Sequence, residues 1–368
     1  MFNCGKFSEK NMNSFQNPAT AISEVKIAEE LGQYEKAFQI LAPFWDEYSQ
    51  FPNAIGLSGE ESAELFLRFG GLIGFLGNSQ KIPNSQEISK NLLTQARQLF
   101  LFFENNEKAA ECENYLALAY SRTGEFTEAT DWLKESLSKN LLENHPTRLN
   151  SHVIETLLDV DSGKYEKVIK RCGELKELFE NHAGDISNGS FHNHLAIAHK
   201  NLGNTDDALK HLKLARSFFH KGDHKIYFGA TENNLAQLFH KVGLYDEAHN
   251  SAQKAIKIFS QIGDKVREGY CLETRAQIFA AERKFDKALQ YVTSAIELLE
   301  SGEGYRKLVE SYRTKVNILI QLNRLAEALT FMTAAHNIAA LYISQELSKE
   351  IIDGVAVIIQ DKYKSFAA

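Results

Sequence analysis

Three histidines lie close together in the segment FHNHLAIAH, and histidine is the commonest metal ligand among the side chains. His192 and His199 are seven residues apart and share a face of a predicted helix, whereas His194 points to another face. The segment has no HExxH motif and no pair of histidines combined with a carboxylate at ligand spacing. We therefore expect partly buried packing histidines and no metal site.

The other side chains that could do chemistry form no catalytic motif. No serine stands in a strained nucleophile turn, and no pair of carboxylates is placed as in a catalytic pocket. The four cysteines are widely separated and include no CxxC pair, which predicts three core residues and one residue in a flexible tail: Cys4, Cys112, Cys172 and Cys271. We predict a protein with no catalytic residues and no cofactor, located in the cytoplasm.

Length and charge exclude further classes of protein. The chain has 368 residues with 41 basic and 48 acidic side chains, a formal charge of −7, which argues against a nucleic-acid partner. The most apolar window, Leu65 to Leu76, contains Arg68 and is shorter than the ~20 residues that cross a bilayer. No stretch of signal-peptide type begins the sequence. We expect neither a nucleic-acid nor a membrane partner.

A repeated pattern organises the chain. Segments such as GEFTEAT, GNTDDAL and GLYDEAH share a turn residue, a variable residue, usually an apolar residue, and then a small residue. The small residues follow one another at intervals of 39 and then 40 residues: Ala129, Val168, Ala208, Ala248, Ala288 and Ala328. A period held over six copies indicates a repeat architecture.

Each repeat is predicted to contain two helices. After the small residue, apolar residues recur at steps of four, three and four, which places them on one helix face. Another helical segment precedes each turn, and glycines such as Gly203 and Gly243 end it. Proline, which breaks helices, does not occur beyond Pro146. These observations predict an all-α fold.

The unit resembles the tetratricopeptide repeat, in a form with a period of about 40 residues of the bacterial type. The residues that carry the resemblance are Leu235, Ala236, Gly243, Tyr245, Ala248 and Ala255. An upstream copy contains Ala37, and Pro43 should kink or shorten its second helix, while a lengthened copy fits residues 59–106. The last two turns depart from the pattern, because Arg283 and Asn323 replace glycine.

The resemblance implies a right-handed α-solenoid of stacked helix-turn-helix repeats. We expect a flexible tail over residues 1–20, a superhelix of about seven helical pairs over residues 21–340, and a capping helix over residues 341–368. The last segment is rich in isoleucine and valine, so a surface for a homodimer is the alternative to a cap.

The resemblance also implies that the first helix of each pair lines a concave face that holds peptide segments. Counting back from the small residues gives the candidate peptide-binding residues: Asn114, Tyr115, Asn193, His194, Asn233, Asn234, Gln237, Glu273, Thr274, Gln277, Arg313 and Asn317. Carboxamides recur among them, and a carboxamide offers a donor and an acceptor that match a peptide backbone. The alternative for each one is a solvated side chain. Glu273 and Arg313 have two open interpretations. They could select a charged side chain of the ligand, or they could form an ion pair between repeats.

Two functions follow from this interpretation. The first is a non-enzymatic scaffold or adaptor whose partner is a protein or peptide segment in the concave groove. The second is a peptide-sensing receptor of bacterial signalling whose superhelix changes shape on binding. A clamp for chaperone tails is not supported, because only Asn234 fits that pattern, whereas Asn193, Ile197, Tyr270 and Thr274 do not.

Overall fold

The computed structural model describes most of the chain. The described residues are 18–45, 52–77, 79, 82–300, 305–342 and 349. They form sixteen α-helices and a short 3-10 helix at Ala42–Phe44, and this part of the chain contains no strand. The predicted all-α fold is confirmed.

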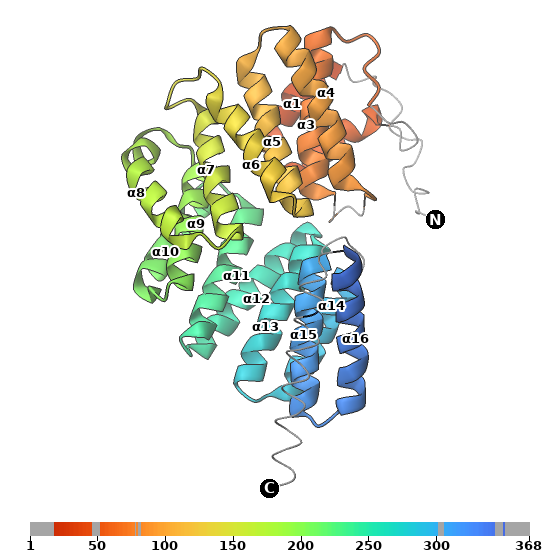
Figure 1. Ribbon diagram of the computed structural model, residues 1–368, viewed down its shortest axis with the longest axis vertical. Coiled ribbons are helices and arrows are strands. Elements are labelled where there is room, and N and C mark those ends of the chain that lie inside the picture. The colour runs from red at the N-terminus through yellow and green to blue at the C-terminus, as the bar shows by residue number, and fades with distance from the viewer. Residues whose placement is uncertain are drawn as a thin grey trace.

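The helices form consecutive antiparallel pairs. The first helices are α1 (Pro18–Glu30), α3 (Gly59–Leu76), α5 (Asn106–Thr123), α7 (Pro146–Asp161), α9 (Asp185–Asn201), α11 (Lys225–Lys241), α13 (Lys265–Ala281) and α15 (Tyr305–Gln321). The second helices are α2 (Tyr34–Leu41), α4 (Ser85–Phe102), α6 (Phe126–Ser138), α8 (Tyr165–His182), α10 (Thr205–Lys221), α12 (Tyr245–Ile262), α14 (Phe285–Leu299) and α16 (Leu325–Tyr342). Figure 1 shows the pairs following one another round an arc, from α1–α6 through α7–α10 to α11–α16.

The repeated small residues hold each pair together. All six of them are fully buried. A small side chain at this position lets the axes of the two helices approach. The apolar stripe that follows packs on the first helix of its own pair and on that of the next pair. In the turn between α11 and α12, Gly243 has a φ of +78°, a conformation that reverses the chain and suits glycine. The same principle explains why the glycine recurs in the sequence.

The N-terminal pairs depart from the regular pattern. Helix α2 ends at Leu41, and Pro43 lies in the 3-10 helix that follows, as the sequence predicts. Helices α3 and α4 occupy the interval 59–106 in which the sequence predicts a lengthened copy, and the described residues contain eight pairs where about seven were expected. They lack the repeat signature, and they pack closely through glycine: a Cβ on Gly70 would lie 2.7 Å from Leu93.

The expected domain boundaries are close to the ends of the helices. Helix α1 begins at Pro18, before the expected boundary at residue 20, and α16 ends at Tyr342, just past the boundary at 340. The proposed cap or dimer segment falls outside the described residues apart from Lys349. Three cysteines are buried free thiols, as predicted: Cys112, Cys172 and Cys271. Cys4 lies outside the described residues.

The histidines of α9 pack against α10. Nδ1 of His192 lies 3.1 Å from Nδ1 of His211, and the ring of His199 stacks on His211 with centroids 5.6 Å apart. These are partly buried packing positions, as predicted for His192 and His199. Burial lowers the pKa of His192, and burial together with the neighbouring histidines lowers the pKa of His211 to about 4.

The histidine stack should make stability depend on pH. A histidine that titrates near 6.5 when unfolded and near 4 when folded destabilises the fold on protonation. Its contribution is fully present above pH 6.5 and is lost as the pH falls towards 4. We expect the melting temperature to fall between pH 7.5 and pH 5, and His211→Gln to reduce that fall. An unchanged pH dependence in His211→Gln would contradict the assignment.

Candidate functional site

Consecutive first helices, such as α7 and α9 or α11 and α13, contact one another directly, which places them on the inner side of the arc. Residues from first helices far apart in the sequence meet there: the ring of Phe75 in α3 lies 6.4 Å from the ring of Tyr227 in α11. The Tyr34 hydroxyl, at the start of α2, lies 3.3 Å from the Tyr227 hydroxyl. The guanidinium of Arg267, in α13, lies 4.8 Å from the Phe75 ring. We call Tyr34, Phe75, Tyr227 and Arg267 the closing contact.

The closing contact places another cation on the inner side. The Arg122 guanidinium, at the end of α5, lies 5.9 Å from the Phe75 ring. Burial and the neighbouring Arg267 charge lower the pKa of Arg122 to about 10. Arg122 makes no ion pair with a described carboxylate, whereas Arg267 pairs with Asp264. The inner side at this point therefore carries uncompensated positive charge.

Six of the predicted residues form a row of carboxamides on the first helices α9, α11, α13 and α15. We call this the carboxamide row: Asn193, Asn233, Asn234, Gln237, Gln277 and Asn317. All six are at least partly exposed. Asn234 donates a hydrogen bond from Nδ2 to Oδ1 of Asn193 over 2.9 Å, which links α11 to α9. That bond leaves Nδ2 of Asn193 as a donor and Oδ1 of Asn234 as an acceptor for a ligand.

The glutamines of the row are also oriented by neighbours. Oε1 of Gln237 accepts a hydrogen bond of 2.9 Å from Nζ of Lys200, which directs its amide nitrogen away from that contact. Nε2 of Gln277 donates over 2.5 Å to Glu273, so its carbonyl oxygen is the remaining group. Donors and acceptors held in fixed directions can pair with the N–H and C=O groups of an extended peptide.

Four predicted residues belong to the packing between repeats, which corrects the expectation that they line the groove. Asn114 is buried and donates to the Thr147 carbonyl over 3.1 Å. His194 is buried against Thr156, and burial lowers its pKa to about 4. Thr274 is buried and bonds to the Tyr270 carbonyl in its own helix. Asn114 and His194 thus contact α7 of the neighbouring repeat, and all three side chains are buried.

Glu273 is the fourth correction. It is buried and accepts hydrogen bonds from Gln277 and, over 2.8 Å, from Thr314 of α15. Burial raises its pKa, so it is a hydrogen-bonded acceptor between repeats and does not present a charge to a ligand. Arg313 is exposed on α15 and forms no ion pair with Glu273. The ion pair considered from the sequence does not form.

Tyr115 lies in the N-terminal half of the arc. A Cβ on Gly71 of α3 would lie 3.2 Å from its ring, so the ring packs on the glycine surface of that helix. Burial raises the pKa of Tyr115. It lies on α5 and is not part of the carboxamide row, which begins on α9.

Sequence reasoning missed a group of lysines beside the row. Burial and the charges of Lys241 and Lys307 lower the pKa of Lys200 to about 8. Lys241 donates from Nζ to the Lys200 carbonyl over 2.6 Å, and Lys307 is paired with Glu310. The three lysines come from α9, α11 and α15, so no local motif reveals them. Lys200 and Lys241 lie at the C-terminal ends of consecutive first helices, which was the available signal, whereas Lys307 lies at the start of α15 and had no such signal.

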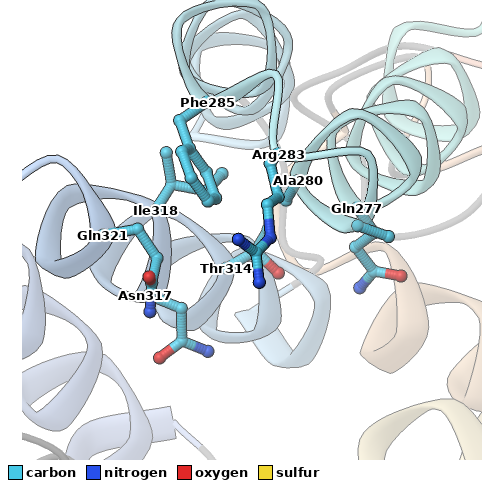
Figure 2. A pocket seen from close by; sticks show the side chains of 9 residues that line it. Gln277, Ala280, Arg283, Phe285, Thr314, Asn317, Ile318 and Gln321 are labelled. Atoms are coloured by element: carbon cyan, nitrogen blue, oxygen red, sulfur yellow. The ribbon is translucent and has the colours of Figure 1, made fainter.

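A pocket of about 590 Å³ lies at the C-terminal end of the carboxamide row, between α13 and α15. Gln277 and Asn317, both predicted from the sequence, line it together with Thr314 and Gln321. Figure 2 shows these polar side chains around the opening, with Arg283 reaching over it and Phe285 and Ile318 on one side. Its lining lets it hold a ligand group that is partly polar and partly apolar.

Family models of the tetratricopeptide repeat match residues 110–146 and 227–301. The chain contains tetratricopeptide repeats. The matched segments contain part of α5 with α6 and most of α11 to α14. No curated protein matches the sequence significantly. No helix in the described ranges is both long and apolar enough to cross a membrane.

Solved structures share the architecture of this chain. A Rap protein complexed with competence and sporulation factor is 14% identical, with a TM-score of 0.62. The match covers 90% of this chain and 99% of that chain. Aspartyl phosphate phosphatase F from Bacillus subtilis is 12% identical, with a TM-score of 0.57 and coverages of 89% and 95%. The human IFIT1 dimer with m7Gppp-AAAA is 16% identical, with a TM-score of 0.57 and coverages of 94% and 72%. At these identities the likeness shows the fold, a helical solenoid.

Proposed function

We propose that this protein is a non-enzymatic interaction scaffold that binds an extended peptide segment of a partner along the carboxamide row. The observation that supports this most directly is the bond between Asn234 and Asn193, which leaves one donor and one acceptor in fixed directions on neighbouring repeats. A rigid solenoid holds such groups in place before the ligand arrives. Binding therefore does not have to order them, which favours affinity.

The chemistry of the inner side supports binding rather than catalysis. Its cations Arg122 and Lys200 have no described carboxylate within ion-pair distance, and Glu273 is already bonded to two side chains. No described cysteine is activated, because burial raises the pKa of all three thiols. We place the protein in the cytoplasm, where such thiols stay reduced, with a protein partner and without a nucleic-acid or membrane partner.

Removing the carboxamides tests the proposal. A row that reads the peptide backbone tolerates many sequences, so a fluorescent pool of acetylated and amidated random octapeptides can serve as the probe. We expect Asn193→Ala/Asn234→Ala/Gln237→Ala to weaken binding roughly a hundredfold, from about 1 kcal/mol per lost hydrogen bond. Fluorescence anisotropy measures the affinity, and the melting temperature checks folding.

The matched control removes a carboxamide from the other side of the pair. Asn250 is exposed on α12, a second helix, and Asn250→Ala should leave pool binding unchanged. If the wild type binds the pool and the folded triple variant binds it equally well, the proposed role of the carboxamide row is contradicted.

The closing contact favours a second candidate, a peptide-sensing receptor. A ligand that occupies the inner side next to Tyr227 competes with or reinforces the contact between α3 and α11. Binding energy that differs between the closed and open forms would then change the shape of the superhelix. The Rap protein solved with its factor provides a solved example of this fold with a bound factor.

A further inference from the structure

The pocket between α13 and α15 exists because two small residues replace large ones. In the repeat register the ends of α9 and α11 carry Lys200 with Asn201 and His240 with Lys241. Helix α13 carries Ala280 and Ala281 at the same positions, and both line the pocket. The longer side chains of the earlier repeats would fill this space, so the cavity is a feature of one repeat rather than of the fold.

Arg283 occupies a turn position where four earlier repeats have glycine. Its φ is +60°, in the left-handed region, as is that of Gly243 at the equivalent place. An L side chain is disfavoured there, so arginine at this position costs some stability relative to glycine. Figure 2 shows its guanidinium directed over the pocket towards Thr314 and Asn317.

The guanidinium of Arg283 has no carboxylate partner within the described part of the chain. It is the single charged side chain among the nine that line the pocket. The adjacent Glu282 is engaged by Nζ of Lys284 at 2.6 Å and by Nε2 of His249 at 2.8 Å. Glu273, behind the pocket wall, is bonded to side chains and buried, which raises its pKa. The charge of Arg283 is thus left for a ligand.

The remaining lining groups describe the rest of the ligand. Phe285 and Ile318 offer apolar surface for methylene groups. Asn317 and Gln321 lie one helical turn apart on α15 and offer donors and acceptors to a peptide backbone. A guanidinium pairs with a carboxylate through two parallel N–H groups, which makes it selective for that anion.

We propose that this pocket binds the acidic side chain of a peptide whose backbone lies along the carboxamide row. The carboxylate pairs with Arg283, and its methylene groups lie against Phe285 and Ile318. This inference rests on the proposed function, and it adds a preference for an acidic residue at one position of the ligand.

Matched peptide pools test the preference. Three fluorescent octapeptide pools, acetylated and amidated, carry Glu, Gln or Lys at the fifth position and are random elsewhere. We expect the wild type to bind the Glu pool about tenfold more tightly than the Gln pool, from one charge-assisted pair. Arg283→Glu should reverse the order and favour the Lys pool. Arg283→Gly should lose the preference without a lower melting temperature, because glycine suits the turn.

The outcomes separate this inference from the proposed function. Equal binding of the three pools, or an unchanged order in a folded Arg283→Glu variant, would overturn the acidic pocket while leaving peptide binding intact. No binding of any pool would overturn the proposed function and this inference together. The fourth pool carries Gln at the fifth position and a free C-terminal carboxylate. If it binds more tightly than the Glu pool, the pocket binds the end of a chain, and the side-chain assignment is overturned.

Discussion

Arg68→Met is expected to lower the free energy of unfolding by about 3–5 kcal/mol, because it leaves buried carboxylates without their cation. The Arg68 side chain is 6% exposed and pairs with Glu29 at 2.6 Å and Glu64 at 3.0 Å. It also pairs with Glu111 of α5, and the charges of Arg68 and Lys108 lower the pKa of Glu111 to about 2. One arginine thus joins α1, α3 and α5.

Urea unfolding at pH 7 measures this effect. The matched control is Arg324→Met, which breaks a fully exposed pair with Glu327 at 2.6 Å and should not change stability measurably. The loss in Arg68→Met should shrink as the pH falls from 4.5 towards 2, because protonation of Glu111 removes the unpaired charge. A change below about 1 kcal/mol at pH 7 would mean that the cluster is not a buried ionic link.

Phe75→Ala combined with Tyr227→Ala is expected to open the closing contact. The Phe75 ring lies 4.6 Å from Tyr34 and 4.8 Å from the Arg267 guanidinium, and Tyr227 bonds Tyr34. Aromatic and cation–π pairs of this kind contribute roughly 0.5–1.5 kcal/mol each. The double variant removes at least two of them, about 1–3 kcal/mol, which shifts a closed-to-open equilibrium by roughly fivefold to a hundredfold or more.

Small-angle scattering of the ligand-free protein measures the opening as a larger radius of gyration. Phe102→Ala is the control, because that ring is 78% exposed and lies outside the closing contact. In the receptor candidate, the peptide pool should also change the radius of gyration of the wild type. Equal radii for the wild type and the double variant would show that the contact does not hold the arc closed.

The fold could be predicted from the sequence because its determinants are local. A buried alanine such as Ala248 and a left-handed glycine such as Gly243 act within one helical pair, and their spacing repeats. Pro43 acts on its own helix in the same way. For helices α3 and α4 the sequence predicted only the interval that holds a copy and not its turn, since glycine packing replaces the repeat signature there.

The positions of the candidate residues in the fold could be predicted only in part. Counting in the register could not distinguish Asn193, which is partly exposed, from His194, which is buried against Thr156 of the neighbouring repeat. The contact between Tyr34 and Tyr227 joins residues 193 positions apart. It depends on the accumulated rotation between many repeats, which no local pattern encodes. The alanine pair that opens the pocket is visible in the register, but its meaning requires the neighbouring helix α15.

Site-specific photo-crosslinking tests peptide binding on the concave face most directly. A photoreactive amino acid at Asn317, exposed at the C-terminal end of the carboxamide row, is compared with one at Lys213, exposed on the second helix α10. Each protein is irradiated with the fluorescent random octapeptide pool. Our account predicts a labelled adduct from position 317 and none from position 213. Adducts from position 213 alone, or equally from both, would contradict it.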